Sequence, residues 1–494
     1  GIVTSLALLE ISLGLLSLIR PQKLRTPALV FPVIAGNLCA FLLVSVVSLL
    51  GFSSIDLEQA LDFGFDRWQP ICTYVSQGFI TSFTEMVNEL PIEKPEGYTD
   101  DETKNIEQEL VAAYDSTYGS SEQRTAAVAQ FNEIKPTVVA VMNESFTDLS
   151  CFEQLQAAGY FGPTFYNSLP DTLVRGTMLA SVAGGGTANS EFEFLTGATT
   201  AFVGVGKIPY QLYQMSDVDS LAKDLKELGY TATAMHPQNP VNYHRDKIYQ
   251  QLGFGDFLSI DDFEGASYYH AGVCDYVTYD KILELLRTNE APQFIFDVTM
   301  QNHGGYEVGS VPAEELTNYC VEGASEGTNA MLNTYLTCIN ASDRDLEYFI
   351  NELRNIGRPV VLVFFGDHQP SIAAALNDEL YPQEDTASHA FRIHQSTYFV
   401  WANYEIAGNT ELNVYDTVGA NEIAAIALNK IGAPLTDYQK ALLATRSDVP
   451  TINVAGYLGA DGLRYDLESE DSPYTSTIDK LRRVQYLEFA TKVQ

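Results

Sequence analysis

Acidic and imidazole side chains recur directly after the short apolar runs of this sequence. Glu144 follows the run 137–142 closely, and Asp367 and His368 follow the run 359–365. Carboxylate oxygens and an imidazole nitrogen are suitable ligands for divalent cations such as Mn²⁺, Mg²⁺ and Zn²⁺. These residues are therefore candidate ligands of one metal ion.

A hydroxyl group extends this set. Thr187 ends the segment SVAGGGT, residues 181–187, and a helix-like run follows it. Glycines permit a tight turn, and the N-terminus of a helix favours negative charge. A divalent cation beside the Thr187 hydroxyl would lower its pKa and make it a nucleophile, as phosphoryl transfer requires. Taken alone, the segment equally fits a structural turn with Thr187 as the helix N-cap, and it is not a P-loop because no GK[ST] follows.

Two histidines also follow apolar runs. His303 comes after the run 293–300, and His236 comes after the run 231–235. A single histidine in such a place is often only a loop residue. In parallel sheets, however, functional groups collect beyond the carboxyl ends of the strands, so the joint occurrence favours one shared site.

Apolar runs alternate with helical patterns from residue 136 onward, which predicts the elements that must hold these residues. Helical patterns occupy 217–230 and 341–357, the second with an Asp-rich start and a Gly stop. The alternation predicts an α/β fold with a mostly parallel central sheet flanked by helices. The predicted strands are 137–142, 231–235, 293–300, 359–365 and 396–402.

The N-terminal region has a different character. Two apolar runs, 2–19 and 28–52, are close to the roughly 20 residues that cross a bilayer, and the basic loop between them is expected to be cytoplasmic. We predict two transmembrane helices in 1–53 as the end of a longer membrane region. A partly helical juxtamembrane connector over 54–134 and an extracellular catalytic domain over 135–494 would follow. A cleaved signal peptide explains two such runs poorly.

Charge and cysteine content exclude other classes of protein. The 494 residues include 28 Lys and Arg against 64 Asp and Glu, a formal net charge of −36, so binding to nucleic acid is not expected. A phosphate-bearing substrate would need a metal ion or a placed Arg. No CxxC pair is present, while Cys320 and Cys338 are either a disulfide of an extracellular domain or two free thiols.

Several motifs occur together in a characteristic order. MNESF, GGGTANSEFEFLTG, HRDKIYQQLGF, MQNHGGY and FFGDHQP lie in this order between residues 136 and 430. The set resembles lipoteichoic acid synthases and related phosphoglycerol transferases of the alkaline phosphatase and sulfatase superfamily. The resemblance implies an alkaline phosphatase/sulfatase-like fold. It also implies a multi-pass protein of a bacterial cell membrane, of the Gram-positive type, with an extracellular catalytic domain.

The resemblance also implies roles for the residues above. Thr187 would be the nucleophile and carry a covalent phosphothreonine, while Glu144, Asp367, His368 and the Thr187 oxygen would bind a single divalent ion, typically Mn²⁺. Mg²⁺ or Zn²⁺ would suit these ligands to differing degrees.

The substrate residues are assigned in the same way. Arg245 matches a family arginine that clamps the phosphate. His303 matches a histidine that contacts the substrate and protonates a leaving group, and His236 matches a further histidine of the pocket. Tyr243 stands where the family often has Trp, which affects the wall that contacts the glycerol.

The implied reaction transfers glycerol phosphate from phosphatidylglycerol in the membrane to a glycolipid, a polyglycerol phosphate or another glycan. The alternatives are a phosphoethanolamine transferase, a metal-dependent phosphodiesterase, or a catalytically silent binding protein. Sulfate-ester hydrolysis is disfavoured because the C/S-x-P-x-R motif of sulfatases is absent from the sequence.

Overall fold

The computed structural model describes residues 70–493. It divides the chain into two compact units, of which the first ends at Ile92 and the second begins at Glu93. The described part of the first unit contains helices α4 (Pro70–Gln77) and α5 (Phe79–Glu89). The apolar runs 2–19 and 28–52 lie outside the described residues. Within 70–493, no helix combines the length and apolar character that a bilayer crossing requires.

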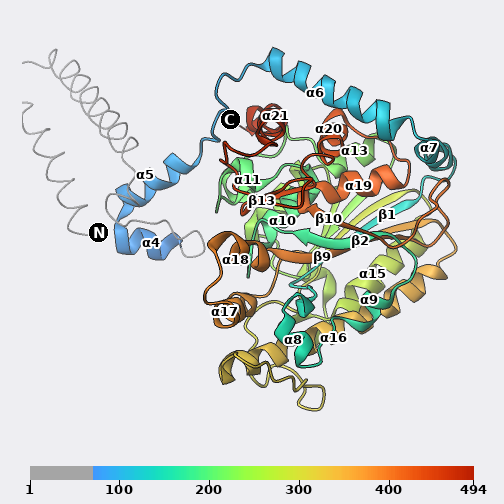
Figure 1. Ribbon diagram of the computed structural model, residues 1–494. Helices are drawn as coiled ribbons and strands as arrows, with labels where there is room; N and C mark the ends of the chain where they lie inside the picture. The colour runs from blue at the N-terminus through green and yellow to red at the C-terminus, as the bar shows by residue number, and fades with distance from the viewer. Residues whose placement is uncertain (1–69, 494) are drawn as a thin grey trace, which may run out of the picture. The chain divides into compact units, whose positions relative to one another are not determined.

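An eight-stranded sheet forms the centre of the second unit, in the order β10-β2-β9-β8-β1-β7-β3-β4 (Figure 1). All of its neighbouring strands pair in parallel except at β9, which is antiparallel to both β2 and β8. The prediction of a mostly parallel sheet is thus confirmed. The strands are β1 (Thr137–Asn143), β2 (Thr172–Leu179), β3 (Thr231–Met235), β4 (Asp256–Leu258), β7 (Gln293–Val298), β8 (Val360–Gly366), β9 (Gln395–Ala402) and β10 (Val414–Gly419).

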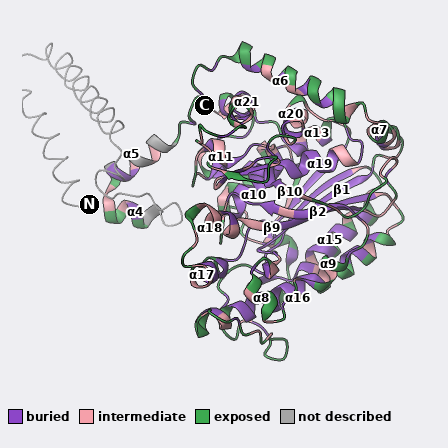
Figure 2. Cartoon of the chain, in the orientation of Figure 1, coloured by how far each residue is buried: buried purple, intermediate pink, exposed green. Residues whose placement is uncertain are grey.

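Helices cover both faces of this sheet. Two successive residues of β8 show this, since successive side chains of a strand point to opposite faces. Phe364 of β8 belongs to the large core cluster that includes Tyr335 of helix α16 (Glu326–Arg354). The next residue, Phe365, has its ring 4.8 Å from that of Phe194 in helix α10 (Thr187–Thr196). Figure 2 accordingly shows buried strands between helices whose outer faces are exposed. The near-continuous apolar runs of the sequence reflect this double burial.

The predicted helices are present with changed bounds. The pattern 217–230 contains helix α13 (Leu221–Glu227). The predicted start of 341–357 was wrong, because residues 341–354 are the second half of α16, which begins at Glu326 with Ser325 as N-cap. Other helices are α8 (Glu153–Ala157), α9 (Thr164–Ser168), α11 (Thr200–Val203), α12 (Pro209–Leu212), α14 (Arg245–Gln251), α15 (Asp275–Thr288), α17 (Ser371–Leu380), α18 (Thr386–Ile393), α19 (Ile423–Lys430), α20 (Asp437–Thr445) and α21 (Thr475–Gln485).

Strands β2 and β10 were not predicted, because polar residues and glycine interrupt them. Gly176 of β2 has φ 153°, and a Cβ there would lie 2.0 Å from the Asp416 carbonyl oxygen of β10. The glycine that weakens the strand pattern in the sequence is therefore the residue that lets the two backbones approach.

Helices α6 (Asp100–Tyr114) and α7 (Glu122–Ile134) pack within the second unit, although they precede the first strand. The Tyr114 hydroxyl donates a hydrogen bond of 2.6 Å to the Asn429 side chain of α19, and Arg124 donates to the carbonyl of the same Asn429. Both helices lie within the segment 54–134, which was predicted to be partly helical. The assignment of 54–134 as a connector stays a prediction.

Cys320 and Cys338 are both free thiols, the first exposed and the second buried in α16. Of the two alternatives that the sequence left open, the structure has the unbonded one.

Two small sheets complete the unit. They are formed by β5 (Tyr268–Tyr269) with β6 (Gly272–Val273), and by β11 (Thr451–Asn453), β12 (Gly456–Leu458) and β13 (Arg464–Tyr465).

Candidate active site

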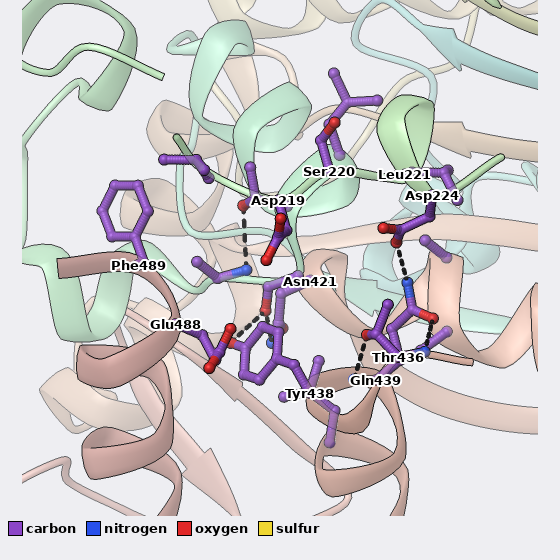
Figure 3. A pocket seen from close by; sticks show the side chains of 18 of the residues that line it. Asp219, Ser220, Leu221, Asp224, Asn421, Thr436, Tyr438, Gln439, Glu488 and Phe489 are labelled. Atoms are coloured by element: carbon purple, nitrogen blue, oxygen red, sulfur yellow. Dashed lines mark hydrogen bonds between the residues drawn. The ribbon is translucent and has the colours of Figure 1, made fainter. Parts of the chain in front are cut away.

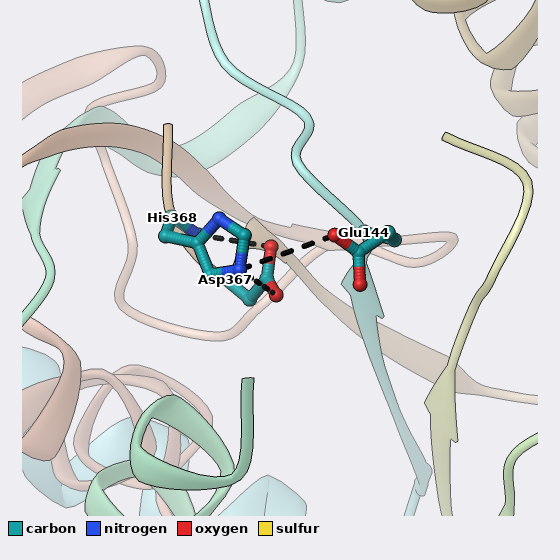
Figure 4. A group of neighbouring side chains, drawn as sticks. All are labelled: Glu144, Asp367 and His368. Atoms are coloured by element: carbon teal, nitrogen blue, oxygen red, sulfur yellow. Dashed lines mark hydrogen bonds and ion pairs between the residues drawn. The ribbon is translucent and has the colours of Figure 1, made fainter. Parts of the chain in front are cut away.

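The neighbouring strands β1 and β8 bring the predicted metal ligands together at their carboxyl ends. Asn143 and Gly366 are paired in register, so Glu144 and Asp367, the next residues, leave the sheet side by side. The ligand atoms of Glu144, Asp367 and His368 all lie within 4.8 Å of one another, and all three residues are buried (Figure 4). Among residues 70–493, this is the single such group of three His, Cys, Asp or Glu side chains.

Hydrogen bonds orient this cluster from one side. The amides of Ser145 and His368 donate to Asp367 Oδ1 at 2.7 and 2.9 Å. His368 Nδ1 lies 2.8 Å from the Gln369 carbonyl oxygen, a contact that requires the proton on Nδ1 and leaves Nε2 as an acceptor. Ser145 adopts φ 51°, an uncommon conformation for a non-glycine residue and one that recurs at functional sites.

The opposite side of the cluster fits a cation. Asp367 Oδ2 and His368 Nε2 are buried and have no hydrogen-bond partner, although they lie 3.0 Å apart. Burial and the neighbouring Glu144 raise the pKa of Asp367 to about 6. Buried acceptors without donors are costly, and a divalent ion between them would remove that cost. Two carboxylates and an imidazole suit Mn²⁺, Mg²⁺ or Zn²⁺.

Thr187 lies beside this cluster as the first residue of α10. Its Oγ1 is 3.5 Å from Glu144 Oε2, and the side chain is buried. Gly186, with φ 88°, is the N-cap of the helix, and a Cβ at that position would lie 2.8 Å from the Val182 side chain. Ser190, one turn further, donates a 2.7 Å hydrogen bond to the Asp367 carbonyl oxygen and ties the helix to the metal-ligand loop. Thr187 is therefore not a capping residue; its hydroxyl is directed at the acidic cluster.

Arg245 is held by a partner that the sequence analysis missed. It is 2% exposed and pairs with the fully buried Glu191, whose Oε1 lies 3.0 Å from Arg245 Nε. Tyr249 donates a 2.7 Å hydrogen bond to Glu191 Oε2. Glu191 is four residues after Thr187, so the two share one face of α10; this spacing is the signal that could have revealed it.

The backbone immediately before Arg245 is strained. Tyr243 and His244 both have left-handed backbone conformations, with φ 55° and 59°. Each such residue costs on the order of 1–3 kcal/mol and is found mainly where the surroundings enforce it. The Tyr243 ring lies 5.0 Å from the Arg245 guanidinium carbon and interacts electrostatically with Glu144, so it borders the same site.

The two predicted histidines also reach this site. His236 is buried after β3, and its Nδ1 lies 2.9 Å from the Val298 carbonyl oxygen. Burial, with Arg245 and His303 nearby, lowers its pKa well below the ordinary value, which keeps the ring neutral. His303 is exposed and interacts electrostatically with Asp367 and His368. The structure therefore brings all of the predicted residues to one edge of the sheet.

A buried polar network supports the two loops that carry these residues. Asp275, at the start of α15, accepts hydrogen bonds from Asn143 at 2.8 Å and from Ser342 at 2.5 Å. Asn302 donates to Ser342 at 2.9 Å. Asn143 precedes Glu144 and Asn302 precedes His303, so the network links both loops. Its members come from distant parts of the chain, and no sequence pattern marks them.

Comparison with known proteins now defines the class. Residues 136–425, more than half of the chain, match the Sulfatase family, and the chain belongs to that family. The match runs from β1 to the start of α19 and includes every residue of the site described above.

Particular relatives refine this picture. The Streptococcus pyogenes phosphoglycerol transferase GacH, solved with sn-glycerol-1-phosphate, superposes with a TM-score of 0.62 at 23% identity, over 80% of this chain and 95% of that chain. The lipoteichoic acid synthase LtaP of Listeria monocytogenes gives a TM-score of 0.50 at 17% identity, over 72% of this chain and 92% of that chain. These likenesses confirm the predicted alkaline phosphatase/sulfatase-like fold.

Among curated proteins, a Rhizobium meliloti protein named for cyclic beta-1,2-glucan modification is 27% identical over 343 residues. The alignment covers 68% of this chain and 50% of that protein. The chain spans about half the length of the curated relatives that it matches.

Proposed function

We propose that this chain is a metal-dependent phosphoglycerol transferase that uses Thr187 as its nucleophile. The observation that carries the proposal is the position of Thr187 at the N-terminus of α10, 3.5 Å from Glu144 in a buried cluster with free acceptors. Membership of the Sulfatase family and the fold shared with GacH and LtaP support it.

The reaction consists of two displacements at phosphorus. In the first, Thr187 loses its hydroxyl proton to solvent and Oγ1 attacks the phosphodiester of phosphatidylglycerol. The bond between phosphorus and the diacylglycerol oxygen breaks, and diacylglycerol leaves with a proton that His303 supplies. In the second, an acceptor hydroxyl gives up its proton to His303 and attacks the phosphothreonine. The bond between phosphorus and Thr187 Oγ1 then breaks, and this oxygen takes a proton back from solvent, which restores the free hydroxyl. Charge and protons balance over the cycle.

The remaining residues position the phosphate. Arg245, fixed by Glu191, presents Nη1, the guanidinium nitrogen that Glu191 does not engage, and neutral His236 with Tyr243 forms the wall beside it. Glu144, Asp367 and His368 would hold one divalent ion, which when bound supplies charge stabilisation and lowers the pKa of the Thr187 hydroxyl. The dipole of α10 acts in the same direction.

The donor, acceptor and location complete the proposal. The donor is phosphatidylglycerol, and the acceptor is a glycolipid, a polyglycerol phosphate or a glycan, in keeping with a relative named for glucan modification. In this proposal, residues 1–53 anchor the protein in a bacterial cell membrane. Residues 54–134 connect this anchor to the catalytic domain, residues 135–494, which lies outside the cell. Mn²⁺ is the proposed ion.

The test places the full chain in liposomes that contain phosphatidylglycerol labelled in its glycerol headgroup, with Mn²⁺ present. We expect release of diacylglycerol and a glycerol phosphate adduct on the peptide that contains Thr187. Thr187→Ala should abolish both, while Thr288→Ala, which removes an exposed hydroxyl on α15, should leave both unchanged.

A panel of other lipids separates the alternatives. Turnover of phosphatidylethanolamine alone would replace the proposal with a phosphoethanolamine transferase. Transfer of the label only to water would make the protein a phosphodiesterase. Unchanged turnover in Thr187→Ala would overturn the covalent route for every donor.

A further inference from the structure

A cavity lies at the other end of α10 from Thr187. It has a volume of about 340 Å³ and is bounded by the residues that end α10, by the starts of α13 and α20, and by Glu488 and Phe489 near the C-terminus (Figure 3). Glu107 of α6 closes it. None of the proposed catalytic or metal-binding residues lines this cavity, so it is a separate site.

The wall of this cavity is strongly acidic. Of the described residues that line it, none is Lys, Arg or His. The C-terminal end of α10 adds the negative pole of its dipole. Outside the wall, Lys492 pairs with Asp219 at 2.7 Å and with Glu488 at 2.9 Å, which leaves three carboxyl groups without a basic partner. The acids in the wall are Glu107, Asp219, Asp224, Asp437 and Glu488.

One carboxyl group in particular lacks a partner. Glu107 is 7% exposed, and its Oε1 is buried without a hydrogen bond. Burial, followed by the charges of Glu488 and Asp437, raises its pKa to about 7. The carboxyl group of Glu107 therefore lies among the other acids of the cavity. Its Oε1 is a buried acceptor that a ligand N–H group could satisfy.

The spacing of the acids decides between a metal ion and an organic cation. Within residues 70–493, three ligand atoms approach within 4.8 Å of one another only at Glu144, Asp367 and His368. No three acids of this cavity therefore lie close enough to coordinate one ion together. Several separate acceptors instead match a ligand with several separate N–H donors, and the ring of Tyr438 in the wall offers surface for its carbon chain and for cation–π contact.

We propose that this cavity binds a small aliphatic diamine or polyamine, with one ammonium group at Glu107 and another toward Asp224. Asp224 already accepts a 2.9 Å hydrogen bond from Gln439, which holds its carboxyl group in place. The proposal does not depend on the transferase reaction, because the cavity shares no residue with that site.

Isothermal titration calorimetry of the detergent-solubilised full chain with putrescine and with spermidine, at 150 mM NaCl, tests the proposal. We expect saturable one-site binding, weakened at least tenfold by Glu107→Gln. Glu405→Gln removes the same charge at an exposed position outside the cavity and should leave the affinity unchanged. Thr187→Ala should also bind as the wild type does, so loss of turnover and loss of amine binding are separable.

Three results would overturn the proposal. These are heats that do not saturate, equal weakening by Glu107→Gln and Glu405→Gln, or displacement of the amine by stoichiometric Ca²⁺. The second result would mean diffuse attraction to a chain of net charge −36. Thermal melting first establishes that Glu107→Gln folds. If it does not, Asp224→Asn, on the partly exposed start of α13, takes its place with the same expected loss.

Discussion

Glu191 and Arg245 form a buried ion pair that ties the helix of the proposed nucleophile to the proposed phosphate clamp. Arg245 is 2% exposed and Glu191 is fully buried, and Arg245 Nε contacts both carboxylate oxygens, at 3.0 and 3.3 Å. Because Glu191 and Thr187 lie on the same face of α10, one rigid element sets the position of both the attacking hydroxyl and the guanidinium group.

Glu191→Gln should lower stability and transfer together. Removing one partner of a buried ion pair leaves the other charge uncompensated, at a cost of about 3–5 kcal/mol. Denaturant unfolding measures this loss, and the rate per folded molecule should also fall because Arg245 is no longer oriented. Asp171→Asn is the matched control, since it breaks the half-exposed two-bond pair with Arg354 and should cost less than about 1 kcal/mol. Equal costs for the two variants would contradict the role of Glu191.

Metal binding should stabilise the folded chain through Asp367. Adding Mn²⁺ at 100 times its dissociation constant should raise the free energy of unfolding by about 2.7 kcal/mol, because the ion binds the folded state. Asp367→Asn should remove this gain. The control is Asp378→Asn, which breaks an exposed contact of the same kind, 3.0 Å between Asp378 and His389. Stabilisation by Mn²⁺ that survives in Asp367→Asn would place the ion elsewhere.

Gly186→Ala should disable the site more than it weakens the fold. The alanine would have to adopt φ 88° with its Cβ 2.8 Å from Val182, so the start of α10 must shift and carry Thr187 with it. We expect transfer to fall at least tenfold, with a modest loss of stability. Gly327→Ala serves as the control, since its Cβ meets nothing within 4 Å in the first turn of α16 and the change should be neutral or slightly stabilising. Full activity in Gly186→Ala would show that the turn does not position Thr187.

Stability should decrease as the pH rises from about 4 to about 8. Burial raises the pKa of Asp297 to about 8, since its Oδ1 has no partner and only Thr278 donates to Oδ2. The unfolded carboxyl group has a pKa of about 3.9, so between these values the folded state binds more protons and loses stability as they leave. Melting temperatures without divalent cations should be several degrees lower at pH 8 than at pH 5.5. Asp297→Asn should reduce this difference, and an unchanged difference would exclude Asp297 as its source.

The sequence alone determined the type of fold and most members of the candidate site. Strands buried on both faces must be apolar throughout, so β1, β3, β7, β8 and β9 were visible as runs. Parallel strands place the residues after their carboxyl ends at one edge of the sheet. For this reason Glu144, His236, His303, Asp367 and His368 could be grouped from their positions along the chain. The glycine-rich turn before a helix-like run added Thr187, and the ordered motifs added Arg245.

Tertiary structure decided the features that depend on contacts between distant residues. It made Gly186 rather than Thr187 the N-cap, paired Glu191 with Arg245, and left Cys320 and Cys338 apart as free thiols. It also formed the acidic cavity from α6, α10, α13, α20 and the C-terminal segment. Local sequence records periodicity and turn chemistry, whereas a buried pair or a cavity wall exists only when separate elements pack, and no single segment encodes which partner it will meet.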